Sequence, residues 1–550
     1  MSEPDAPVDL VLSGAAVYTS HPSRPWAEAV AVKGGRIVAV GTPPEAMAQA
    51  GKGTRVLDLA GRMVLPGFQD AHVHPEHGGL ARARCNLHDA TDAEAYGAII
   101  RSYAESHPKA TWILGGGWSM DAFPAGTPHR SILDAIVPGR PVFLPNRDGH
   151  GAWVSSRALE MAGVTRDTPD PPDGRIERDA DGEPQGTLHE GGMDLVRRLI
   201  PAPTQAEQED ALRLAQGYLH SLGITAWQDA IVPPDLLKAY RAMADRGDLT
   251  ARVVAALWWE RGQGLEQIES MLAQRSWGTA GRLRATAVKI MQDGVIENFT
   301  AAVLEPYLDA HAQPTTNRGI SFVEPDLLDP AVIRLDAEGF QVHIHAIGER
   351  AVREALDALG AAARTNGRWG ARHHIAHIQV IHPDDLLRFE ELEVVANAQP
   401  FWACMDGQMA NLTIPFLGPE RTNWQYPFAS LRATGARLAF GSDWPVSTPD
   451  PLLEMEVAVR RVAPNDRSAE PFLPDQRLDL ETALDAFTMG SAFVNHLDDE
   501  TGSIEVGKLA DMVVLDRNLF EIEDGKLGEA KVLLTLVEGQ PVFTSDEIGW

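Results

Sequence analysis

Eight strand-like runs constrain the fold of this chain more than any other feature. Each run is apolar, ends in polar or glycine-rich residues and leads into a segment with a helical pattern. The runs are GFQDAHVH (67–74), ITAWQDA (224–230), ARVVAAL (251–257), ATAVKIMQDG (285–294), FQVHIHAIG (340–348), RHHIAHI (372–378), EVVANAQP (393–400) and RLAFGSDWP (437–445). Repeated strand–helix units predict a parallel sheet, and eight of them predict an α/β protein built on a (β/α)8 TIM barrel.

The segments outside these runs predict two further domains. Short β-branched stretches such as VDLVLSGAAVYT and KLADMVVLD occur at both ends of the chain. We expect residues 1–65 and 498–550 to pair into a small β-sandwich beside a barrel of residues 66–79 and 206–497. Roughly 150 residues separate the first two runs, far more than a normal βα loop. Residues 80–205 are therefore predicted to form an inserted lobe that covers the active site.

Composition excludes some partners. Lys and Arg number 48 and Asp and Glu number 77, which gives a formal net charge of −29. Such an acidic surface repels phosphate backbones and anionic lipid, so we expect neither nucleic acid nor a membrane as partner. The two cysteines, Cys85 and Cys404, fit no CxxC spacing, and the N-terminus has no basic segment followed by an apolar one. We expect a cytoplasmic protein.

Histidines stand at the end of the first run. His72 and His74 are two residues apart, so on a strand both side chains point to the same face. Ligands of a barrel metal site come from the ends of several strands. The fifth run offers His343 and, nearer its end, His345; the sixth ends at His377 and the eighth at Asp443. A core packing role is open for each, but four strand ends with suitable ligands favour a metal site.

The fourth run contains Lys289 within the apolar segment AVKIM. A buried lysine is costly unless it is paired or neutralised. Two interpretations stay open: an ion pair, with Asp293 as partner, or carboxylation of the amine by CO2. A lysine carbamate is anionic and has two oxygens, so it can bridge two metal ions.

Together these motifs resemble the binuclear amidohydrolase superfamily. DAHVH, VKIMQDGVIENFT, HIHAIGERAV, HIAHIQ, ANAQPFW, FGSDWPV and GSIEVGKLADMVVLD are similar to the branch of the N-substituted formamide deformylases. The resemblance implies that the metal ligands are His72, His74, Lys289, His345, His377 and Asp443. It also implies that Asp443 is the acid–base and that His150, in RDGHGAWVSSRAL, lies near the substrate.

Two positions depart from the pattern of that branch. Glu349 stands where the branch has Asp in HAIGDRA, and Ala376 stands where it has Glu in IEHAQ. The second change removes a carboxylate beside a ligand histidine, which puts in doubt a supporting role for that position and alters the expected metal affinity.

These features predict a metal-dependent hydrolase of a carbon–nitrogen bond other than a peptide bond. Zinc suits the ligands, as one ion or two, with manganese, iron and nickel as open alternatives. A hydroxide produced by the metal would attack a small amide, for instance an N-substituted formamide, with Asp443 moving the proton. We expect further substrate contacts, with ordinary packing as the alternative for each, from Trp118, Gln399, Trp402 and Trp444.

Two other functions remain open at this point. The first is a mononuclear deaminase of the same superfamily, which would not need Lys289 and would favour a catalytic glutamate such as Glu349. The second is a non-catalytic scaffold, which should have lost ligands, whereas all six are present. A homodimer is compatible with the surface left by the lobe and the β ends, but nothing in the sequence fixes it.

Overall fold

The structure is a computed structural model that describes residues 7–550. Its centre is a barrel sheet of eight parallel strands in the order β19-β18-β17-β16-β15-β14-β13-β6. All eight expected runs form these strands. They are β6 (Phe68–Val73), β13 (Ile224–Val232), β14 (Arg252–Trp258), β15 (Leu283–Met291), β16 (Gln341–Ala346), β17 (His374–His377), β18 (Val395–Ala398) and β19 (Leu438–Phe440).

The two edge strands of this sheet, β6 and β19, meet just beyond their ends. Asp443 N donates to His72 O at 2.8 Å, and His74 N donates to Trp444 O at 2.9 Å. Gly441 permits this approach, because a Cβ there would lie 2.5 Å from His72 N. The closure brings the ligand candidates of the first and eighth strands together.

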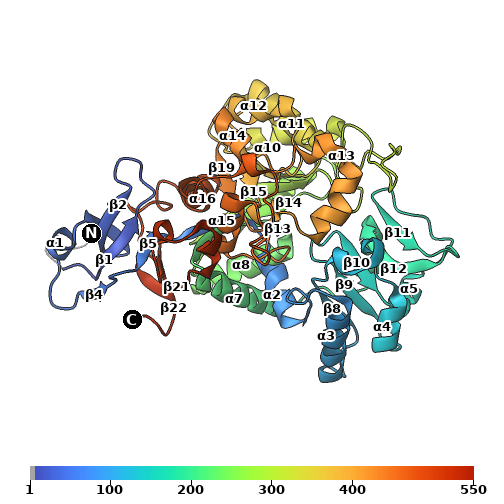
Figure 1. Ribbon diagram of the computed structural model, residues 1–550, viewed down its shortest axis with the longest axis horizontal. Helices are drawn as coiled ribbons and strands as arrows, with labels where there is room; N and C mark the ends of the chain where they lie inside the picture. The colour runs from blue at the N-terminus through green and yellow to red at the C-terminus, as the bar shows by residue number, and fades with distance from the viewer. Residues whose placement is uncertain (1–6) are drawn as a thin grey trace.

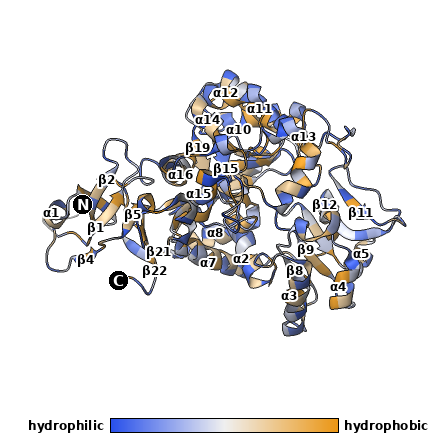
Figure 2. Cartoon of the chain, viewed as in Figure 1, coloured by the Kyte–Doolittle hydropathy of each residue, from blue (hydrophilic) through white to orange (hydrophobic). Residues whose placement is uncertain are grey.

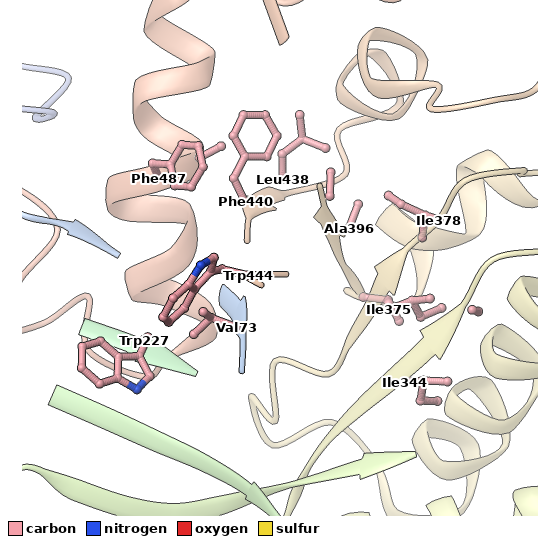
Figure 3. Close-up of a cluster of buried hydrophobic side chains, with 14 of the residues drawn as sticks. Val73, Trp227, Ile344, Ile375, Ile378, Ala396, Leu438, Phe440, Trp444 and Phe487 are labelled. Atoms are coloured by element: carbon pink, nitrogen blue, oxygen red, sulfur yellow. The ribbon is translucent and has the colours of Figure 1, made fainter. Parts of the chain in front are cut away.

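Helices surround the barrel and bury the outward side chains of its strands. They include α7 (Gln205–Ser221), α8 (Pro234–Arg246), α9 (Gln267–Gly278), α10 (Pro325–Ala337), α11 (Glu349–Asn366), α12 (Leu386–Glu391), α14 (Phe428–Thr434), α15 (Pro451–Arg460) and α16 (Leu480–Asp485). Figure 3 shows part of this outer layer, with Ile344 and Phe440 among its apolar side chains. Because Ile344 faces outward, its neighbours His343 and His345 face the barrel interior.

The two ends of the chain form one flanking sheet. Its order is β22-β21-β20-β5-β1-β2-β3, and β4 also pairs with β1. Strands from the two ends of the chain thus pair as expected, in one continuous sheet in which β5 lies between β1 and β20. The strands are β1 (Leu10–Tyr18), β2 (Trp26–Lys33), β3 (Arg36–Gly41), β4 (Arg55–Asp58), β5 (Met63–Pro66), β20 (Met512–Leu515), β21 (Val532–Val537) and β22 (Gln540–Thr544). This sheet lies at the left of Figure 1.

The segment after β6 forms a lobe at the opposite side of the barrel (Figure 1). Helix α2 (Pro75–Ala83) leads into a sheet of order β11-β12-β10-β9-β8-β7. Its strands are β7 (Cys85–Asn86), β8 (Ile113–Gly116), β9 (Val142–Pro145), β10 (Gly151–Val154), β11 (Gly174–Arg178) and β12 (Pro184–Glu190), with helices α3 (Ala93–Ser106), α4 (Arg130–Ile136), α5 (Ser156–Ala162) and α6 (Gly191–Arg197). Apolar residues run through the strands of the lobe and of the flanking sheet (Figure 2). The residue limits of the three domains stay a prediction.

Both cysteines are buried and unpaired by disulfide. Among the described helices, none combines the length and the apolar character needed to cross a bilayer.

Candidate metal centre

Three of the expected ligands form a tight cluster at the C-terminal mouth of the barrel. Ligand atoms of His72, His377 and Asp443 all lie within 4.8 Å of one another, and all three residues are buried. Burial holds the pKa of His72 and of His377 well below the usual range, and the positive charges of neighbouring residues act in the same direction. Both imidazoles are therefore neutral, the form that binds a metal.

The contacts of Asp443 test whether this cluster fits a metal ion. Its Oδ1 lies 2.8 Å from His74 Nε2 and 3.2 Å from His72 Nε2. The same buried oxygen nevertheless accepts no hydrogen bond from a described residue. The imidazole nitrogens thus approach the oxygen without pointing N–H groups at it, an arrangement that fits donor atoms converging on a shared cation. Nitrogen and carboxylate donors of this kind suit a divalent metal.

Two of the clustered residues have an unusual backbone conformation. His377 has φ 77° and Asp443 has φ 55°, in the left-handed region that residues other than glycine rarely adopt. Such conformations cost about 1–3 kcal/mol each and concentrate at functional sites. The fold accepts this strain where it aims the two ligands at one point.

Lys289 lies beside the cluster and forms no ion pair with an acid among the described residues. Its side chain is 3% exposed, and its Nζ is 3.5 Å from His72 Nε2. Burial lowers the pKa of Lys289 to about 7, although the negative charge of Asp443 opposes that shift. Within residues 7–550 it forms no ion pair with Asp293, whose carboxylate instead accepts backbone N–H groups of residues 302, 347 and 348. The ion-pair interpretation is therefore wrong.

His345 lies next to the cluster. Its ring centroid is 4.4 Å from that of His377. Its Nε2 faces the carbonyl oxygen of Gly294 at 3.3 Å and Asp293 Oδ1 at 3.5 Å. The structure thus brings His345 to the site, with its nitrogen turned toward the loop after β15.

A chain of buried amides and histidines lies beneath the ligands, and one end is fixed by backbone carbonyls. Gln341 Nε2 lies 2.8 Å from the carbonyl oxygens of Arg372 and Val494, which can only accept. The Gln341 Oε1 therefore accepts from Gln228 Nε2, at 3.0 Å. This leaves the Oε1 of Gln228 as an acceptor for the histidines.

A second amide fixes the same orientation independently. Asn397 Nδ2 donates to the carbonyl oxygen of Ala71 at 2.9 Å and to His374 Nδ1 at 3.0 Å. His374 must then carry its proton on Nε2, which lies 3.0 Å from Gln228 Oε1. Gln341 at one end of this hydrogen-bonded series and Asn397 at the other therefore require the same orientation of the Gln228 amide.

This orientation fixes the tautomer of His72, one of the expected metal ligands. His343 Nδ1 lies 2.7 Å from Gln228 Oε1 and must carry the proton. Its Nε2 then accepts from His72 Nδ1, at 2.9 Å. The lone pair of His72 Nε2 is left free and faces the cluster, as a metal ligand requires.

A histidine of the lobe approaches the same site. His150 Nδ1 lies 2.9 Å from Glu190 Oε1, and its ring centroid is 5.7 Å from that of His345. Burial alone would lower the pKa of His150, but Glu190, Asp148 and Asp443 together raise it to about 9. The lobe therefore holds an imidazolium beside the expected metal ligands.

A cavity of about 340 Å³ lies at the mouth between lobe and barrel. Trp402 and Trp444 line it, and Trp402 stacks on His377 with ring centroids 5.2 Å apart. Trp118 does not reach it, because the side chain is fully buried in the lobe and donates to the carbonyl oxygen of residue 144. Gln399 is buried beneath the mouth, with an Oε1 that has no hydrogen-bond partner among the described residues.

The two departures from the branch pattern lie outside the ligand cluster. Glu349 begins helix α11, and its Oε1 accepts from Leu304 N at 3.0 Å. Ala376 is fully buried on β17 and pairs in register with His345.

Sequence reasoning missed the groups that hold the ligands. In the sequence, Gln228 lies within an apolar strand-like run, and His343 is a weaker ligand candidate than His345. Strand residues two apart share a face, so a polar residue two positions before an expected ligand also faces the barrel interior. That spacing is the sequence signal for a supporting residue. No sequence signal links Glu190 to His150, since they are 40 residues apart.

Comparison with known proteins agrees with this geometry. The sequence model of the amidohydrolase family matches residues 55–543. Protein LONG AFTER FAR-RED 3 of Arabidopsis thaliana is 33% identical over 97% of this chain and 91% of its own length. N-substituted formamide deformylase of Arthrobacter pascens is 28% identical over 96% of this chain and 97% of its own. An uncharacterized metal-dependent hydrolase from Pyrococcus furiosus has a TM-score of 0.71 at 27% identity, covering 92% and 99% of the two chains.

The family match spans most of the chain, and it coincides with a buried site whose donors suit a metal. The chain belongs to the amidohydrolase family, as a metal-dependent hydrolase that acts on carbon–nitrogen bonds.

Proposed function

We propose that this hydrolase cleaves a small non-peptide amide, with N-substituted formamides as the first class to test. The observation that carries the proposal is Asp443 Oδ1, which is buried 2.8 Å from His74 Nε2 and accepts no hydrogen bond within residues 7–550. A carboxylate oxygen in this place can bind a metal and still exchange a proton with the substrate. The deformylase from Arthrobacter pascens supports the substrate class through similarity over nearly the whole chain.

The proposed metal is zinc, held by the six residues that the resemblance implies: His72, His74, Lys289, His345, His377 and Asp443. When bound, zinc would polarise the substrate carbonyl and lower the pKa of a bound water to about 7. We propose that CO2 carboxylates the neutral amine of Lys289 with release of a proton, and that the two carbamate oxygens would help to hold two ions. A buried amine without an acidic partner, whose pKa falls to about 7, supports this, because only the neutral amine reacts with CO2.

Two side chains then have roles of their own. Asp443 accepts the proton of the attacking water and passes it to the leaving nitrogen. His150, charged by its contact with Glu190, donates a hydrogen bond to the carbonyl oxygen as negative charge develops there. Cleavage of a formamide releases formate and an amine.

Formate release from N-benzylformamide and formanilide, with zinc-loaded protein, tests this function. Asp443→Asn should keep most of its metal and lose at least about a hundredfold in turnover, since general acid–base catalysis contributes that much or more. Asp235→Asn, at a carboxylate 78% exposed on α8, is the matched control and should keep full activity. An unchanged rate in Asp443→Asn would exclude it as the acid–base.

A further inference from the structure

The cavity at the barrel mouth has more acidic than basic groups in its wall. The charged residues that line it are Arg82, Asp89, Arg147, Asp148, Glu297 and Asp406. Within residues 7–550, none of the four carboxylates forms an ion pair with a lysine or arginine. Burial raises the pKa of Asp148 and of Asp406, and the charges of His150 and Arg147, respectively, oppose that rise. Among the described residues, no basic group is a main cause of the pKa shift of Glu297, so the charge of this acid is the least compensated.

The two arginines of the wall are engaged elsewhere. Arg82 lies over the ring of Tyr218, 4.1 Å from its centroid, and is exposed at the rim. Arg147 donates through Nη2 to the carbonyl oxygen of His88 at 2.9 Å. Both guanidinium groups thus contact other parts of the wall, which leaves the deeper acids facing the cavity.

Two acids lie below the rim. Asp148 and Glu297 are half-buried, whereas Asp89 and Asp406 are exposed. Burial raises the pKa of Glu297, and the charges of Asp148 and Asp406 raise it further. The carboxylates are therefore close enough to repel one another, and a cation placed among them would relieve that repulsion.

Tyr426 gives an independent sign of a ligand at this place. Its side chain is only 2% exposed, yet it lines the cavity. Within the described part of the chain the hydrogen bonds of Tyr426 are made by its backbone, and its hydroxyl forms none, so the hydroxyl is available to a group in the cavity. Glu297 and Asp406 both influence its pKa, which burial raises well above the usual range. The hydroxyl therefore belongs to the acidic part of the wall and lacks the partner that a ligand would supply.

We propose that the substrate carries a cationic group, a protonated amine or an alkylated ammonium, which binds among Asp148, Glu297 and the Tyr426 hydroxyl. The aromatic faces of Trp402 and Trp444 in the same cavity favour such a cation. The cation lies at the mouth, so the amide bond extends toward the metal ligands beneath. This inference rests on the proposed amide hydrolysis and names its substrate class more narrowly.

Binding of three probes to the zinc-loaded protein, followed by tryptophan fluorescence without turnover, tests the inference. The probes are benzyltrimethylammonium, which has no lone pair for a metal, neutral benzyl alcohol and anionic benzenesulfonate. The ammonium should bind about tenfold more tightly than the alcohol, and the sulfonate more weakly than both. Glu297→Gln and Tyr426→Phe should reduce the preference for the ammonium and leave the affinity for the alcohol unchanged.

Glu305→Gln is the matched control, because that glutamate is 79% exposed and does not line the cavity; it should keep the preference. Equal affinities for ammonium and alcohol in the wild type, or an unchanged preference in Glu297→Gln, would overturn the inference. Hydrolysis of neutral amides together with equal affinities would overturn the cation site alone. A preference for the ammonium in a protein that cleaves no amide would uphold the site and refute the proposed function.

Discussion

Replacing Gln228 by leucine removes the amide that orders the histidines beneath the metal ligands. Gln228 is fully buried, and its Oε1 accepts from His343 Nδ1 at 2.7 Å and from His374 Nε2 at 3.0 Å. Leucine leaves both N–H groups without an acceptor and the Oε1 of Gln341 without its donor. Each buried unsatisfied group costs about 1–3 kcal/mol, so the loss of these three partners should lower the free energy of unfolding of the metal-free protein by roughly 3–9 kcal/mol.

The same change should weaken metal binding. Without Gln228, His343 is free to carry its proton on Nε2, which then donates to His72 Nδ1. His72 is driven to the opposite tautomer, with a proton on the nitrogen that faces the metal. Loss of a partner that orients a ligand costs about 10–100-fold in metal affinity. Zinc affinity is measured by competition with a chromogenic chelator, and stability by denaturant unfolding of the metal-free protein.

Gln69→Leu separates the two effects. Gln69 is also fully buried on a barrel strand, and its amide contacts Thr501 at 2.8 Å and Asn495 at 3.2 Å, with no contact to a ligand. It should lose stability while zinc affinity stays at the wild-type value. An equal loss of zinc affinity in both variants, or no loss in Gln228→Leu, would refute the tautomer argument.

Two further predictions concern the strand closure and the lobe histidine. Gly441→Ala places a Cβ 2.5 Å from His72 N, so β6 must shift and zinc affinity, measured by chelator competition, should fall by at least about tenfold. Burial lowers the pKa of His150, and Glu190→Gln removes the strongest of the anions that together raise it to about 9. His150 then loses its proton at a lower pH, so the alkaline limb of kcat/KM should move to lower pH. The stability that the raised pKa of His150 provides below about pH 9 should also shrink.

Each of these variants has a control in the chain. Gly217→Ala adds a Cβ in open space on helix α7 and should leave zinc affinity unchanged. Glu177→Gln breaks the contact with His189 at 3.1 Å in the same lobe and should not move the alkaline limb. An unchanged zinc affinity in Gly441→Ala, or an unmoved limb in Glu190→Gln, would contradict the assigned roles.

The barrel could be predicted because its strands are regular. Residues on successive strand positions alternate between the two faces, so alternation along β16 is enough to place His345 inside the barrel and Ile344 outside. The same rule placed His72, His377 and Asp443 at one mouth. Once eight strand–helix units are recognised, closure of the barrel brings distant parts of the chain together, and no further sequence pattern is needed to predict this.

What could not be predicted depends on packing between segments far apart in sequence. Trp118 follows a glycine cluster in the lobe, and only the folded lobe shows that the ring packs against Trp153 rather than facing substrate. Asp293 does not pair with Lys289, because its carboxylate accepts hydrogen bonds from backbone N–H groups of other loops. The cavity residue Tyr426 lies in a segment without any recognised motif.

Metal content per chain tests the central claim most directly. Wild-type protein, purified without chelator and with bicarbonate present, should contain close to two zinc ions by elemental analysis. Lys289→Ala should contain one or none, because the bridging carbamate cannot form. About one ion in both proteins would contradict the binuclear, carbamate-bridged site, and absence of metal from both would contradict the metal-dependent chemistry itself.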